Sequence, residues 1–176
     1  MNLGKKILNN VFKNKGVISA SIVGSYTEKK SLEKIGDIDV VVICNQLSKQ
    51  LIKKLIKSVY RINKDNLKKK IVVNYSFGPL KLSSEKFLPI HLMIYDVNSH
   101  IEHVTSSPFT CYDWERSKLY KGIPLNQIYP VRNLQLRDFS NSRRNSNEYL
   151  EDLMKNRISI REYFFFNKKI KIKKKF

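Results

Sequence analysis

Apolar residues between positions 3 and 97 follow two kinds of spacing, one typical of helices and the other of strands. Residues 3–12 and 48–62 repeat apolar side chains every three or four positions, which predicts two amphipathic helices. Compact, partly β-branched runs predict four strands, at residues 17–23, 37–44, 71–77 and 88–97. The polar segment 25–34 has room for a short helix. This order of elements is typical of an α/β (α+β) domain, in which helices flank a mixed β-sheet.

The C-terminal part of the chain has a less regular pattern. Residues 106–130 are interrupted by prolines and contain the single tryptophan, Trp114. Apolar positions between Glu148 and Phe166 predict a closing helix. We therefore expect a core over residues 1–105 and a helical and irregular extension over 106–166 that packs on it. Residues 167–176, almost all Lys and Ile, are expected to form a mobile basic tail that contacts anions.

The charge balance of the chain is strongly positive. Its 176 residues include 34 basic and 15 acidic side chains, which gives a formal net charge of +19. Such a surface attracts polyanions, including nucleic acids and nucleotides. The excess is mostly Lys, however, and it accompanies many Asn and Ile residues and a single alanine, Ala20. An AT-rich genome explains the same composition equally well, so the charge alone supports an RNA partner only weakly.

Several classes of protein are excluded. The two cysteines, Cys44 and Cys111, are too few for a disulfide framework, and we expect Cys44 to be buried in its apolar run. His100 and His103 lie in a polar stretch without nearby thiols, so we expect them to be solvated rather than to bind zinc. The N-terminus is charged, and no apolar run approaches the roughly 20 residues that span a bilayer. These features predict a soluble, cytoplasmic protein without a membrane partner.

The segment with the clearest chemistry joins the first two predicted strands. Ile22-Val23-Gly24-Ser25 is followed by eleven residues and then by Asp37-Ile38-Asp39. Side chains alternate along a strand, so the carboxylates of Asp37 and Asp39 lie on one face and repel each other unless a cation bridges them. Mg²⁺ prefers one or two carboxylates together with phosphate oxygens. Gly24 allows a phosphate to approach the backbone, and a following helix N-terminus would supply free N–H donors. The combination indicates metal-assisted phosphoryl transfer.

Gly-Ser, a spacer and then Asp-apolar-Asp-apolar resembles the signature of the nucleotidyltransferase superfamily related to DNA polymerase beta, which includes minimal nucleotidyltransferases. The resemblance covers residues 17–97, and the order of elements agrees with it. It implies the nucleotidyltransferase fold, with Gly24 and Ser25 holding the β and γ phosphates of a nucleoside triphosphate such as ATP. It also implies that Asp37 and Asp39 bind Mg²⁺ or Mn²⁺. An acceptor hydroxyl would then attack the α-phosphate and release pyrophosphate.

The chain departs from this family at one position. The family carries a third acid on a later apolar strand, where it binds the metal and accepts a proton, and the matching residue here is His91. His91 can replace the acid, since a neutral imidazole can act as a base and binds Mn²⁺, Fe²⁺ or Zn²⁺ better than Mg²⁺. Alternatively, Asp96, on the opposite strand face, is the third acid. In a third interpretation, transfer activity is weakened or lost.

The sequence therefore predicts an enzyme with Asp37, Asp39 and His91 as catalytic residues. It would transfer a nucleoside monophosphate to a hydroxyl of an RNA end, a protein or a small molecule. The alternative is a catalytically impaired module of the same fold that binds nucleotide or nucleic acid without transfer. Because the chain is short, we expect a homo-oligomer or a partner protein to complete the acceptor site. Four arginines either belong to the acceptor side or form a solvated cluster: Arg132, Arg137, Arg143 and Arg144.

Overall fold

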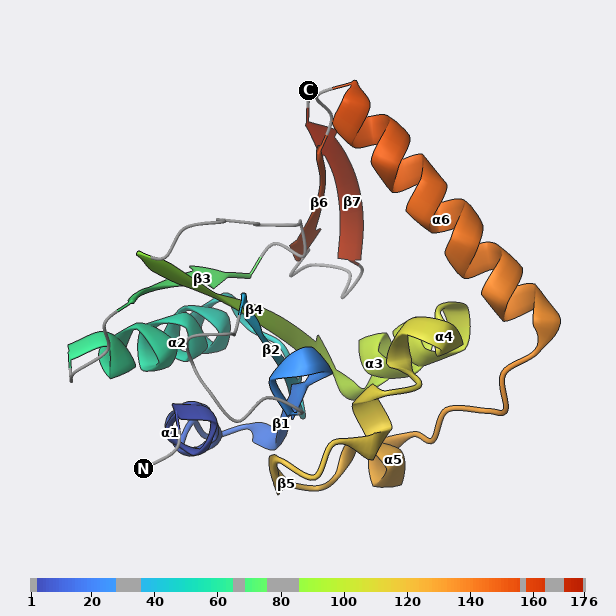
Figure 1. The fold of residues 1–176 in the computed structure, drawn as a ribbon. Helices are drawn as coiled ribbons and strands as arrows, with labels where there is room; N and C mark the ends of the chain where they lie inside the picture. The colour runs from blue at the N-terminus through green and yellow to red at the C-terminus, as the bar shows by residue number, and fades with distance from the viewer. Residues whose placement is uncertain are drawn as a thin grey trace.

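A five-stranded mixed sheet forms the centre of the molecule (Figure 1). The structure, a computed structural model, describes residues 3–27, 36–64, 69–75, 86–155, 158–163 and 170–175. The strands are β1 (Val17–Val23), β2 (Ile38–Cys44), β3 (Lys70–Asn74), β4 (Phe87–Asp96) and β5 (Tyr120–Gly122), in the spatial order β3-β4-β2-β1-β5. β4 runs parallel to both β2 and β3, whereas β1 is antiparallel to β2 and β5. The predicted α/β class with a mixed sheet is confirmed.

Two amphipathic helices cover one face of this sheet, as the apolar spacing predicts. These are α1 (Leu3–Phe12) and α2 (Lys49–Tyr60), which lie beside each other in Figure 1. Their apolar stripes, including Ile7 and Leu55, are buried against alternate residues of the strands. Fully burying a side chain of this size contributes about 1.5–3 kcal/mol. The Ser48 hydroxyl accepts a hydrogen bond from the Leu51 backbone N–H at 3.1 Å, so the predicted cap of α2 is also confirmed.

The other face is covered over the C-terminal end of β2 and β4. The helices there are α3 (Val97–Ser106), α4 (Pro108–Cys111) and α5 (Leu125–Ile128), with a 3₁₀ turn, η4 (Trp114–Arg116). They form a second apolar cluster around Tyr95, Val104 and Trp114. Since these elements come from residues 97–128, part of the predicted extension packs on the core. The boundaries at residues 105 and 166 stay a prediction.

The closing helix predicted over 148–166 is confirmed for residues 148–154 and wrong for residues 158–163, which form a strand. The observed helix, α6 (Leu136–Met154), begins twelve residues earlier than predicted, and it is followed by the antiparallel pair β6 (Ile158–Tyr163) and β7 (Ile170–Lys175). The strand-like alternation of Ile158 and Ile160 finds a partner in β7, and β-branched residues favour such pairing over a helix. Residues 170–175 of the expected mobile tail are therefore also a strand.

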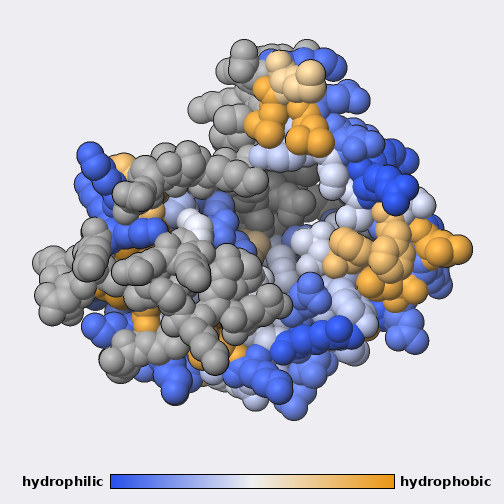
Figure 2. Space-filling model, viewed as in Figure 1, coloured by the Kyte–Doolittle hydropathy of each residue, from blue (hydrophilic) through white to orange (hydrophobic). Residues whose placement is uncertain are grey.

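α6 extends away from the sheet (Figure 1) and buries little of its surface. Its exposed apolar side chains are Leu136, Phe139, Leu150, Leu153 and Met154. Figure 2 shows apolar surface at both ends of this helix. The Ser- and Asn-rich first half of α6 has no apolar stripe, which is why its spacing gave no helical signal. Across the described part of the chain, no helix combines the length and the apolar character needed to cross a membrane.

Two other predicted elements lie only partly within the described residues. The strand expected at 71–77 is observed as Lys70–Asn74, and residues 76–80 with the expected Gly78-Pro79 turn lie outside the described residues. The short helix expected within 25–34 is observed as a 3₁₀ turn, η1 (Gly24–Thr27). Residues 28–35 lie outside the described residues.

Candidate functional site

The sheet register brings the predicted site residues together at the N-terminal end of β2. Asp39 is the second residue of β2 and pairs with Val23 on one side and with His91 of β4 on the other. Asp37 immediately precedes the strand. Asp39 has the parity of Val41 and Ile43, so its side chain lies on the sheet face opposite α1 and α2. Polar side chains separated by more than 50 residues in the chain thus form one site.

Gly24 follows the last residue of β1 and lies next to the Asp39 side chain. Its φ is +72°, a left-handed conformation that side chains rarely adopt. A Cβ at this position would lie only 2.8 Å from the Asp39 Oδ2 atom, so the absence of a side chain gives the carboxylate its room. Ser25 follows in the backbone of η1. Gly24 and Asp39 are therefore neighbours.

Tyr26 anchors the η1 turn to the first helix, which sequence reasoning missed. Its ring is buried, and its hydroxyl accepts a hydrogen bond from the Gly4 backbone N–H at 3.0 Å. This bond ties η1 to α1 across 22 residues of sequence. The only sequence signal was an aromatic residue in an otherwise polar segment.

The two carboxylates of the site repel each other. Burial raises the pKa of Asp39 above its usual value, and the charge of Asp37 raises it further, whereas His91 lowers it. The Asp37 side chain is 40% exposed, so this end of the site is open to solvent. A bound divalent cation would offset both the cost of burying a carboxylate charge and the repulsion between the two carboxylates. Carboxylate oxygens are also ligands that such a cation prefers. The residues present therefore fit a divalent metal ion.

His91 occupies the strand position expected of the third acid. It lies beside Asp39 in the parallel register, and its Nε2 atom is 3.7 Å from the Asp37 Oδ2 atom. On the other side of the ring, Nδ1 is 3.3 Å from the Asn74 amide nitrogen. Asn74 ends an apolar run at the end of β3. A polar residue at that position was the only sign in the sequence that could have indicated a role for Asn74. Among the described residues, no three His, Cys, Asp or Glu side chains already stand close enough together to hold an ion.

Asp96, the alternative third acid, lies at the other end of the strands. It pairs with Cys44, five positions beyond the pair of Asp39 and His91. Its carboxylate caps α3 by accepting hydrogen bonds from the Ser99 backbone N–H at 2.8 Å and the Ser99 hydroxyl at 2.7 Å. The side chain is 3% exposed. Its location and its capping role separate Asp96 from the two other acids.

The remaining histidines were predicted to be solvated, and this is wrong for His100. His100 is 1% exposed and lies beside Tyr95, and neither of its ring nitrogens has a hydrogen-bond partner among the described residues. His103 is partly buried, with its Nδ1 atom 2.6 Å from the Tyr95 hydroxyl. Both belong to α3, whose packing on the sheet was not visible in its polar sequence. Cys44 is buried, as predicted.

A family comparison agrees with this arrangement. The model of the nucleotidyltransferase domain family matches residues 5–120, well over half of the chain. The chain belongs to the nucleotidyltransferase domain family. The match includes β1 to β4 and every residue of the candidate site, and it supports nucleotidyl transfer as the general activity. No curated protein and no solved structure matches this nucleotidyltransferase domain.

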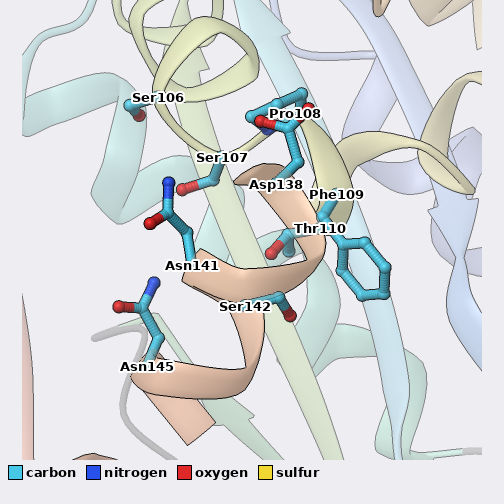
Figure 3. A pocket seen from close by; sticks show the side chains of 9 residues that line it. All are labelled: Ser106, Ser107, Pro108, Phe109, Thr110, Asp138, Asn141, Ser142 and Asn145. Atoms are coloured by element: carbon cyan, nitrogen blue, oxygen red, sulfur yellow. The ribbon is translucent and has the colours of Figure 1, made fainter. Parts of the chain in front are cut away.

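The four arginines considered for the acceptor side belong to α6 or to the segment before it, and the pocket beside this helix is lined by residues outside the candidate site. Arg132 is held by Asp138 in a two-pronged ion pair with both N–O distances at 2.7 Å, while the other three arginines are exposed on α6. Between α6 and the junction of α3 with α4 lies a small polar pocket (Figure 3). Its polar lining residues are Ser106, Ser107, Thr110, Asp138, Asn141, Ser142 and Asn145. None of the residues of the candidate site lines it.

Proposed function

We propose that this domain transfers a nucleoside monophosphate from a nucleoside triphosphate to an acceptor hydroxyl. The observation that carries the proposal is the meeting of the Gly24 turn with Asp37, Asp39 and His91 at one end of the sheet. A turn without a side chain beside paired carboxylates is suited to a metal-bound triphosphate. A polyanionic acceptor such as RNA would also be attracted by the net charge of +19.

Each residue has a defined part in this proposal. Asp37 and Asp39 would hold a divalent ion, Mg²⁺ or Mn²⁺, which supplies charge neutralisation for the triphosphate when bound. The backbone at Gly24 and Ser25 would position the β and γ phosphates. The acceptor oxygen forms a bond to the α-phosphorus, the bond from this phosphorus to the β-phosphate oxygen breaks, and pyrophosphate leaves. The hydroxyl proton passes to a base of the site or to water.

The test is a transfer assay with each α-labelled nucleoside triphosphate, Mg²⁺ or Mn²⁺, and total RNA or cell protein as acceptor. Asp39→Asn and Asp37→Asn remove one site carboxylate each with little change in volume. Asp113→Asn is the matched control, because Asp113 is an exposed acid outside the site. We expect label transfer by the wild-type chain and by the control, and loss of transfer in both site variants. Full transfer by either site variant contradicts the proposal.

A second candidate function is nucleotide or RNA binding without transfer. The observation that favours it is His91 at the position where the family carries an acid. It predicts that labelled triphosphate or RNA binds to the wild-type chain, that Asp39→Asn weakens binding of the triphosphate, and that no labelled product forms with any acceptor.

A further inference from the structure

A buried amide fixes the orientation of the His91 ring. Asn74 is 7% exposed and pairs with His91 in the register of β3 and β4. Its Nδ2 atom lies 3.3 Å from the His91 Nδ1 atom. With Nδ1 turned to β3, the opposite ring nitrogen, Nε2, is turned to β2 and the Asp37 carboxylate, 3.7 Å away. The ring of His91 thus lies between Asn74 on β3 and the acidic site.

An amide can orient either neutral form of the ring. An amide nitrogen only donates, so with Nδ2 against Nδ1 the ring proton lies on Nε2. A half-turn of the amide presents its oxygen instead, which accepts from Nδ1–H and leaves the Nε2 lone pair free for a cation. Such a polar group behind a ligating imidazole is the usual means of fixing its tautomer and ring orientation. An apolar side chain at position 74 could support neither form.

We propose that Asn74 is a positioning residue for His91, and that His91 Nε2 joins Asp37 and Asp39 as a donor to one divalent ion. This inference rests on the proposed function, and it adds the class of ion. One imidazole nitrogen beside two carboxylates shifts the preference from Mg²⁺ towards first-row transition ions such as Mn²⁺, Fe²⁺ and Zn²⁺. Because these three side chains do not yet surround one point in the structure, the proposal requires that they rotate towards a common ion when it binds.

Mn²⁺ is the probe, because its bound form reports directly on nitrogen ligands by pulsed electron paramagnetic resonance. The whole chain is loaded with Mn²⁺ without nucleotide, and ¹⁴N coupling is recorded. We expect coupling in the wild-type chain and none in His91→Asp, which restores an acid at that position. The affinity for Mn²⁺ relative to Mg²⁺, measured by competition, should fall in His91→Asp. Because the chain has three histidines, this variant assigns the nitrogen.

Two variants at position 74 separate positioning from mere packing. Asn74→Leu removes the polar partner of Nδ1, and we expect Mn²⁺ affinity to fall about 10–100-fold with weakened ¹⁴N coupling. Asn74→Asp keeps an acceptor for Nδ1–H, so it should retain the coupling and the affinity. Thermal melting in chelator checks that each variant is folded. If Asn74→Leu fails to fold, the smaller Asn74→Ala, which also lacks a polar partner for Nδ1, takes its place with the same expected loss of affinity and coupling.

The outcomes distinguish this inference from the proposed function. Saturable Mn²⁺ binding that depends on Asp39 but shows no ¹⁴N coupling overturns the inference and leaves the proposed function intact. Unchanged affinity and coupling in a folded Asn74→Leu overturns the positioning role. Absence of saturable Mn²⁺ binding to the wild-type chain overturns the inference, and together with absent transfer it overturns the proposed function as well.

Discussion

Replacing Gly24 with alanine tests whether the turn after β1 shapes the acidic site. Two separate effects are expected. At a φ of +72° a side chain costs about 1–2 kcal/mol of folding free energy. In addition, the new methyl group would stand 2.8 Å from the Asp39 Oδ2 atom, well inside ordinary contact distance, so the carboxylate must move. The first effect lowers stability, and the second weakens binding of a divalent ion.

Gly16→Ala is the matched control. Gly16 also has a positive φ, +97°, but a Cβ there would meet only the Leu51 Cδ2 atom at 3.6 Å, an ordinary contact. For a chain of this size, 1–2 kcal/mol corresponds to roughly 2–8 °C in melting temperature. We expect a loss in this range for both variants by calorimetry in chelator. Only Gly24→Ala should also lose transfer activity and Mn²⁺ affinity. Wild-type ion affinity in a folded Gly24→Ala would refute the reasoning.

The remaining predictions concern the charges of the fold. Because the pKa of Asp39 is raised in the folded chain, its ionised form destabilises the fold above pH 3.8, so Asp39→Asn should melt higher than wild type at pH 7 in chelator; a lower melting temperature would contradict this. Burial lowers the pKa of His100 from 6.5 to about 4. The free energy of unfolding, measured by urea titration, should therefore fall by about 3 kcal/mol as the pH drops from 6.5 to 4. His100→Phe should remove most of this dependence on pH. A hydrogen bond from Arg132, and secondly one from the Gln135 backbone N–H, lowers the pKa of Asp138 to about 2. The Arg132–Asp138 ion pair therefore stabilises the start of α6 fully above pH 3.8, and this stabilisation is lost as the pH falls towards 2. Asp138→Asn should speed amide hydrogen exchange at the start of α6 at pH 7, whereas unchanged exchange would show that the pair does not hold the helix.

Local patterning was sufficient where the sequence alternates apolar and polar residues clearly. The spacing at residues 3–12 and 48–62 predicted α1 and α2, and the β-branched run after Asp37 predicted β2, because burial of one face is what stabilises each of these elements. The same reasoning missed the first twelve residues of α6, which bury almost no apolar face, and it failed for β6, whose strand pairing depends on residues beyond 169. Local periodicity cannot report a partner that is distant in the chain.

The sequence by itself determined the family and named four residues of the candidate site. Gly-Ser and Asp-x-Asp are local motifs, and their flanking apolar strands specify which face each acid takes, so Gly24, Ser25, Asp37 and Asp39 could be named without coordinates. His91 could be named as well, but only as the residue matching a missing acid.

Only the tertiary structure decided how these residues meet. The parallel register of β2 and β4 sets His91 beside Asp39 and leaves Asp96 at the opposite end, while the register of β3 places Asn74 behind the imidazole. A shift of one residue in either register would turn every side chain of the strand to the other face. Strand pairing depends on the whole core packing at once, and for that reason the Asn74–His91–Asp37 contact could not be deduced from any single segment.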